Sequence, residues 1–145
     1  IPYVSMHDST RVMANRLVDA LVANGVEAKP FDLAEMDIGK LAMSLVDAGT
    51  VALGTPTVLG SPHPYAVYAA VLTNALRPKA KFFSIFGSYL WGTKAIETIT
   101  NLLSGLRVET LEPVYVKGLP RQEHLQAIDE LARSIAERHQ AAGLT

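Results

Sequence analysis

Residues 1–25 read IPYVSMHDSTRVMANRLVDALVANG. The apolar start, residues 1–4, predicts a short buried strand, and the polar residues Ser5–Thr10 predict a loop. From Met13 onward apolar residues recur at helical spacing until Asn24-Gly25, a pair that typically ends a helix. A strand, a loop and a helix in immediate succession are the opening unit of a parallel α/β sheet.

The rest of the chain repeats this alternation. Further strands are expected at 26–31, 50–54, 81–86 and 108–116, and further helices at 37–46, 64–76, 93–103 and 120–142. The resulting series of strand–helix units predicts a doubly wound, five-stranded parallel sheet with helices on both faces. Pro30 cannot donate a ladder hydrogen bond, so the strand at 26–31 is expected at an edge.

Composition narrows the classes of function. The 145 residues suit a single domain over residues 1–145, and 49% of them are hydrophobic. The net charge of −1 gives no basic excess for nucleic acid, and the absence of cysteine excludes disulfides and thiolate metal sites. No apolar run approaches a membrane span and we expect no signal peptide, so we expect a cytoplasmic protein. Because the chain opens on Ile1 without an initiator Met, we expect a piece of a longer polypeptide, with a processed N-terminus as the alternative.

Three loops are expected to meet at one rim of the sheet. They follow the strands that end near residues 4, 54 and 86, and they comprise Ser5–Thr10, Thr55–Gly60 and Gly87–Gly92. In an open parallel sheet the carboxyl ends of the strands face the same way, and ligands bind there. The three loops therefore define the candidate site.

The first loop suits a phosphate. Backbone N–H groups at a helix N-terminus attract anions, and the hydroxyls of Ser5, Ser9 and Thr10 would add donors. Asp8 opposes a phosphate unless its side chain points away, and His7 either contacts the edge of a ligand or lies on the surface. The alternative interpretation is that Ser9 or Thr10 merely caps the helix.

The other two loops suit a flat ring. Thr55-Pro56-Thr57 is stiffened by proline, and Gly60 permits close approach of the backbone to a ligand. Tyr89 and Trp91 can stack on a heterocycle, although they could instead pack on a neighbouring helix. A ligand with a phosphate and a flat ring, such as FMN, fits all three loops.

Several motifs, in this order and spacing, resemble those of the flavodoxin-like domain of the flavodiiron proteins (A-type flavoproteins). The matching motifs are Ser5-Met6-His7, Ser9-Thr10, Met13-Ala14, Gly54-Thr55-Pro56-Thr57, Leu76-Arg77-Pro78-Lys79, Phe86-Gly87-Ser88-Tyr89 and Trp91-Gly92. The resemblance covers nearly the whole chain. It implies a flavodoxin-like sheet with strand order 2-1-3-4-5.

The resemblance also implies a non-covalently bound FMN. The cofactor-binding residues would be Ser5, Met6, His7, Ser9 and Thr10 in the first loop, Thr55, Pro56, Thr57, Val58, Leu59 and Gly60 in the second, and Ser88, Tyr89, Leu90, Trp91 and Gly92 in the third. In that family the domain receives electrons from a donor protein or reductase. It passes them to a di-iron centre in a metallo-β-lactamase-like domain, which reduces O2 or NO within a head-to-tail dimer.

Four residues depart from the family pattern. Leu59 and Gly60 stand where asparagine is usual, Leu90 stands where glycine is usual, and Asp8 places an acid where one is rare. Bulk at Leu90 and charge at Asp8 are expected to weaken flavin binding.

The remaining titratable residues suggest no further chemistry. The four histidines, His7, His63, His124 and His139, lack metal-ligand spacing, so no metal site is expected, and no residues form a catalytic triad or carboxylate pair. Two other functions remain open. One is a free-standing NAD(P)H-dependent FMN or quinone reductase, and the other is a flavin-free interaction domain with a degenerate site.

Overall fold

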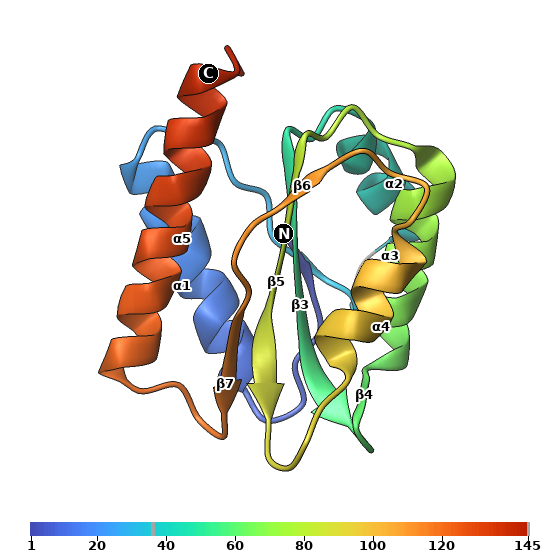
Figure 1. Ribbon diagram of the computed structural model, residues 1–145, viewed down its shortest axis with the longest axis vertical. Helices are drawn as coiled ribbons and strands as arrows, with labels where there is room; N and C mark the ends of the chain where they lie inside the picture. Colours follow the sequence, from blue (N-terminus) through green and yellow to red (C-terminus); the bar gives the residue numbers. More distant parts are fainter. Residues whose placement is uncertain (36, 145) are drawn as a thin grey trace.

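The computed structural model describes residues 1–35 and 37–144, and it contains an open sheet between two layers of helices (Figure 1). The strands run in the order β2-β1-β3-β5-β6, with β7 also paired to β5 and β4 paired to β3. The strands are β1 (Pro2–Tyr3), β2 (Phe31–Asp32), β3 (Thr50–Val58), β4 (Ser61–Pro62), β5 (Phe82–Tyr89), β6 (Glu109–Thr110) and β7 (Val114–Lys117). The predicted order 2-1-3-4-5 is confirmed, with the last predicted strand split into β6 and β7 around Pro113.

Helices cover both faces of the sheet. They are α1 (Ser9–Ala23), α2 (Ile38–Val46), α3 (Pro64–Leu76), α4 (Ala95–Leu102) and α5 (Gln122–Ala141). Helices α1 and α5 lie on one face and α2, α3 and α4 on the other (Figure 1). Because side chains alternate along a strand, β5 serves both layers: Phe82 and Phe86 pack toward α1 and α5, whereas Phe83 and Ile85 pack toward the other helices. None of the described helices has the length and apolar character needed to span a membrane.

Local signals placed the helices well. Helix α3 has its predicted bounds, with Pro64 in its first turn where the missing N–H costs nothing. Asp37 caps α2 as expected, because its Oδ1 accepts a hydrogen bond from the Gly39 N–H at 2.8 Å. Helices α4 and α5 begin about one half-turn later than the sequence predicts, at Ala95 and Gln122.

The predicted strand at 26–31 is wrong in extent but right in position. Only Phe31–Asp32 form β2, and this strand lies at the edge of the sheet beside β1. The Phe31 N–H donates to the Ile1 carbonyl at 2.9 Å and the Leu33 N–H to the Tyr3 carbonyl at 2.8 Å, while the Ile1 ammonium donates to the Lys29 carbonyl at 2.8 Å. Because residues two apart face the same neighbour, Pro30 faces the open edge of the sheet, where its missing N–H breaks no ladder hydrogen bond.

Strands β3 and β5 are longer than predicted, and residues assigned to two of the loops belong to them. Thr55 pairs with Gly87 and Pro56 with Ser88, so β3 runs to Val58 and β5 to Tyr89. Pro56 is tolerated because β1 ends at Tyr3, opposite Gly54. Residues two apart along a strand face the same neighbouring strand, so Pro56, like Gly54, faces β1. Because β1 has already ended at that level, the missing N–H of Pro56 breaks no hydrogen bond between the two strands.

A tight hairpin ends β3. Val58 pairs with Ser61, and both connecting residues have positive φ, 52° at Leu59 and 81° at Gly60, as a type I′ turn requires.

Asparagine tolerates the positive φ at position 59 better than leucine, whose side chain here is 101% exposed and packs on nothing. Leu59→Asn is therefore expected to raise the free energy of unfolding by about 0.5–1 kcal/mol in urea titrations. Leu119→Asn, at an exposed leucine without positive φ, should leave it unchanged.

His139 introduces a pH dependence of stability. His139 is 7% exposed, and its ring stacks on Phe82. Its Nε2 lies 2.6 Å from the Oγ1 of Thr50. Burial lowers the pKa of His139, so below about pH 6.5 this histidine binds a proton more readily in the unfolded chain than in the folded one. The free energy of unfolding is thus expected to decrease as the pH is lowered, by no more than about 1.4 kcal/mol per pH unit for this group.

The measurement is urea unfolding between neutral and mildly acid pH. His139→Gln should show a smaller loss of stability over that range, and an equal loss in parent and variant would contradict the assignment. His63, whose pKa burial also lowers, accounts for part of the slope that remains.

Candidate functional site

The carboxyl ends of the strands gather at one rim, the lower end of the sheet in Figure 1. Tyr3 lies opposite Gly54, and Thr55 lies opposite Gly87. The Lys94 N–H donates to the Gly60 carbonyl at 2.8 Å, which joins the β3–β4 hairpin to the segment after β5. The three predicted segments therefore lie side by side, with the N-terminus of α1 beside them.

Asp8, rather than Ser9 or Thr10, is the N-cap of α1. Its backbone is left-handed, with φ 66°, and its side chain makes no capping hydrogen bond. The Ser5 hydroxyl takes that role by accepting a hydrogen bond from the Arg11 N–H at 3.2 Å. The interpretation of Ser9 or Thr10 as a cap is wrong because the left-handed residue moves the start of the helix one position earlier.

The first turn of α1 retains groups suited to an anion. The N–H groups of Ser9 and Thr10 have no intrahelical acceptor, since they belong to the first turn. The Thr10 hydroxyl is buried and has no partner among the described residues, an arrangement that costs free energy unless a ligand or water satisfies it. Met6 and His7 are exposed beside this turn.

A network of hydroxyls joins the end of β3 to β7 and to the segment that follows β5. The Thr57 hydroxyl lies 2.8 Å from that of Thr93 and 3.0 Å from that of Tyr115. The Tyr115 hydroxyl donates to the Thr55 carbonyl at 2.9 Å, and burial raises the pKa of Tyr115. Sequence reasoning missed Thr93 and Tyr115. The position of Tyr115 at the end of the last predicted strand was the available signal.

The Thr55 side chain is committed to internal structure. It is fully buried, donates to the Pro56 carbonyl at 2.8 Å and accepts from the His63 N–H at 3.0 Å. His63 in turn caps α3, because its Nδ1 accepts from the Tyr65 N–H at 3.0 Å. Thr55 therefore shapes the β3–β4 corner, and Thr57 with the hairpin is left to border a ligand.

The two aromatic residues of the third segment, Tyr89 and Trp91, have different surroundings. Tyr89 stacks on Tyr115 of β7, with ring centroids 6.1 Å apart and planes 5° from parallel. Trp91 is 85% exposed, and Leu90 beside it is 63% exposed. The alternative that both aromatics pack on a helix is wrong, since Tyr89 packs on a strand residue and Trp91 remains open to a ligand or partner.

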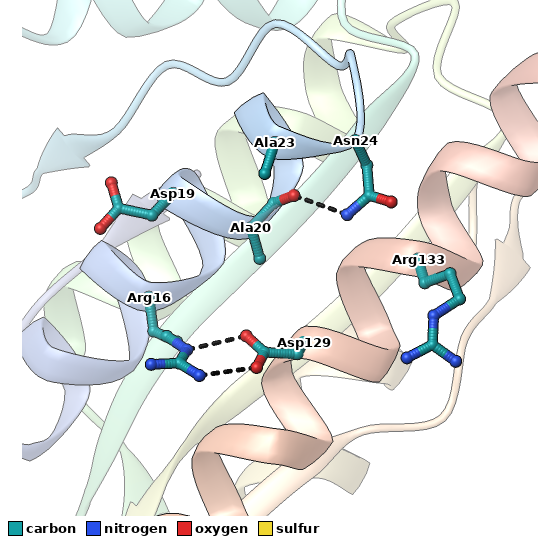
Figure 2. A pocket seen from close by; sticks show the side chains of 7 residues that line it. All are labelled: Arg16, Asp19, Ala20, Ala23, Asn24, Asp129 and Arg133. Atoms are coloured by element: carbon teal, nitrogen blue, oxygen red, sulfur yellow. Dashed lines mark hydrogen bonds and ion pairs between the residues drawn. The ribbon is translucent and has the colours of Figure 1, made fainter.

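Two surface grooves of about 380 and 430 Å³ lie elsewhere, between α1 and α5, and Figure 2 shows the first of them. The first is crossed by a bidentate ion pair, with the Arg16 guanidinium donating to both Asp129 oxygens at 2.8 and 2.7 Å. This contact lowers the pKa of Asp129. The grooves are lined by charged, amide and small apolar side chains and hold no aromatic residue, so they are poorly suited to a flat ring. In residues 1–35 and 37–144 no three metal-ligating side chains cluster.

The fold and rim define an open doubly wound α/β protein, a class that binds ligands at the carboxyl ends of its strands. The family model described as Flavodoxin matches residues 1–131. The chain belongs to the flavodoxin family, and membership in this family implies a flavin site.

Longer proteins contain a similar unit. The nitric oxide reductase of Moorella thermoacetica is 38% identical over 142 residues, covering 95% of this chain and 35% of the relative. The rubredoxin oxygen:oxidoreductase of Desulfovibrio gigas superposes with a TM-score of 0.90 at 27% identity, covering 97% of this chain and 35% of that chain. The flavodiiron protein of Giardia intestinalis has the same fold, with a TM-score of 0.86 at 23% identity and the same two coverages.

These matches confirm the resemblance to the flavodoxin-like domain of flavodiiron proteins. The chain spans about 35% of the length of these three longer proteins.

Proposed function

We propose that the rim binds FMN and that this chain carries electrons to a di-iron centre in a metallo-β-lactamase-like domain outside it. The observation that supports this most is the combination at one rim of the start of α1, where the buried Thr10 hydroxyl has no partner among the described residues, and the exposed ring of Trp91. When bound, FMN supplies one- and two-electron redox chemistry. The chain's own contribution is to hold and orient the flavin and to exclude water from it.

Each segment has a role in this proposal. Ser9 and Thr10 offer N–H and hydroxyl donors to the phosphate, and the Ser5 hydroxyl, while accepting from Arg11, retains its own proton to donate. The β3–β4 hairpin borders one edge of the ring, held in place by the hydrogen bonds of Thr57. Trp91 covers the other side, while Tyr89 is stacked on Tyr115.

The lengths of the relatives support a partner domain. Because this chain matches about 35% of each longer protein, we propose that it works as one domain of a larger assembly, with the acceptor of its electrons on another domain or subunit. Reduction of O2 or NO by that acceptor, a head-to-tail dimer and a separate electron donor belong to the same proposal. Two of the relatives, a nitric oxide reductase and a rubredoxin oxygen:oxidoreductase, support it by their names.

Titration of the flavin-free chain with FMN tests binding directly. Saturable quenching of flavin fluorescence, with a shifted visible absorption band, is the expected result. The exposed side chains of Leu59, Leu90 and Trp91 would also suit a flavin-free interaction domain. A folded chain that does not bind FMN would favour that function and contradict ours.

Anaerobic addition of NADPH to the FMN-loaded chain tests the remaining alternative, a free-standing NAD(P)H-dependent FMN or quinone reductase. An electron-transfer domain should keep its visible flavin absorption when NADPH alone is added and lose it when dithionite follows. Bleaching by NADPH alone would identify a free-standing reductase.

A further inference from the structure

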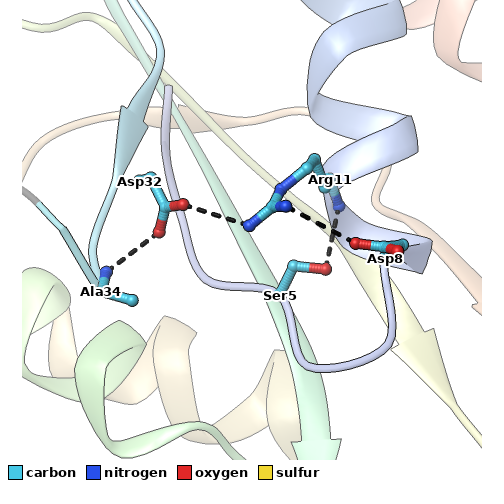
Figure 3. Close-up of polar contacts among 5 residues, drawn as sticks. All are labelled: Ser5, Asp8, Arg11, Asp32 and Ala34. Atoms are coloured by element: carbon cyan, nitrogen blue, oxygen red, sulfur yellow. Dashed lines mark hydrogen bonds and ion pairs between the residues drawn. The ribbon is translucent and has the colours of Figure 1, made fainter.

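The carboxylate of Asp8 stands beside the proposed phosphate position, and its orientation decides whether an anion is tolerated there. The side chain is 77% exposed and makes no hydrogen bond to the helix start. It faces the Arg11 guanidinium instead, with 3.6 Å between Oδ1 and Nη1 (Figure 3). A carboxylate left free at this point would repel a phosphate through their like charges.

Arg11 is itself anchored from a second direction. Its Nη2 donates to Asp32 Oδ2 at 3.3 Å, and Asp32 Oδ1 accepts from the Ala34 N–H at 3.0 Å in the turn after β2. The Asp32 side chain is 19% exposed, so it is a fixed acceptor rather than a mobile surface group. The Arg11 N–H also binds the Ser5 hydroxyl, so this one residue links the turn after β2, the first loop and α1 (Figure 3).

These ion pairs contribute little to folding. Arg11 is 46% exposed, and pairs between exposed charges are typically of small value because solvent screens them. Their effect on a bound anion is larger, because a phosphate monoester carries nearly two negative charges that interact with both Asp8 and Arg11. The geometry therefore points to a role in ligand binding more than in stability.

We propose that Arg11 is a positioning residue of the phosphate site, which holds the Asp8 carboxylate away from the start of α1 and cancels its charge so that a phosphate monoester can bind. This inference rests on the proposed function and deepens it. It explains how an acid can occupy the first loop of a phosphate site.

Comparison of FMN with riboflavin, which lacks the phosphate, tests the inference. Arg11→Gln is expected to lower FMN affinity about tenfold while leaving riboflavin affinity and the urea midpoint unchanged. Arg11→Lys, which keeps the charge, should recover most of the loss. High salt should shrink the difference between parent and Arg11→Gln, because the effect is electrostatic and exposed.

A double-mutant cycle identifies Asp8 as the residue through which Arg11 acts. In an Asp8→Gly background, where no carboxylate needs neutralising, Arg11→Gln should change FMN affinity by less than about twofold. A full loss in that background would contradict the inference, as would an Arg11→Gln variant that binds FMN like the parent or loses FMN and riboflavin equally.

A second probe separates this inference from the proposed function. Sodium phosphate, compared with sodium chloride at matched ionic strength, is expected to raise the melting temperature of the parent chain and not of Arg11→Gln. If the parent binds no FMN but shows this difference, the proposed function fails and the phosphate site stands. If phosphate stabilises both chains equally or neither, the inference about Arg11 is wrong.

Discussion

Gly87→Ala is expected to destabilise the protein by at least ~4 kcal/mol, a large part of the about 5–15 kcal/mol that stabilises a small domain in total. Gly87 lies in β5 directly opposite Thr55 of β3. A Cβ added there would overlap the Thr55 carbonyl oxygen and stand 2.7 Å from the Tyr115 ring. The neighbouring group is backbone in the middle of the sheet, so no side-chain rotation relieves the overlap.

Gly92→Ala provides the matched control for this prediction. It lies at the same rim, but nothing stands within 4 Å of an added Cβ. Its free energy of unfolding in urea should match that of the parent within about 0.5 kcal/mol. A Gly87→Ala variant as stable as Gly92→Ala would show that β3 and β5 are not packed as closely at this point as the structure indicates.

Trp91→Ala is expected to weaken FMN binding about tenfold or more, because stacking of an aromatic side chain on a flat base contributes about 1–3 kcal/mol. The side chain is 85% exposed, so its removal leaves no cavity, and the urea midpoint should not change. Trp91→Phe should retain much of the affinity. Isothermal titration calorimetry with FMN measures all three proteins.

Tyr68→Ala controls for loss of any exposed aromatic residue. Tyr68 lies on α3 and is 55% exposed, outside the three rim segments. We expect it to bind FMN like the parent. If Trp91→Ala also bound FMN like the parent, the ring would lie elsewhere, and Trp91 would be better explained as a contact for a partner domain.

Much of the fold was predictable because its signals are local. Pro64 at a helix start, Asp37 as a cap and Asn24-Gly25 as a stop each act within one turn of the backbone. The ends of β3 and β5 were not predictable in the same way. Thr-Pro-Thr and Gly-Ser-Tyr favour loops locally, and only the pairing of residues about 30 positions apart draws them into the sheet.

The candidate site likewise combines features that local sequence signals predict with features that depend on contacts between distant segments. The sequence indicated that three segments would meet at one rim, and the ligand-binding roles of Ser9, Thr10 and Trp91 stay predictions. It did not indicate that Arg11 turns Asp8 aside, because that depends on Asp32 arriving from another strand. The contact of Tyr115 with Thr55 and Thr57 depends likewise on β7 pairing with β5.

Mapping the flavin site by ¹H–¹⁵N NMR tests the central claim most directly. FMN added to the labelled chain should shift the amides of Ser9 and Thr10 together with those of Gly60 and Gly92, since the phosphate and the ring occupy one rim. Shifts gathered instead at Ala23, Asn24 and Arg133, in the grooves between α1 and α5, would contradict the account.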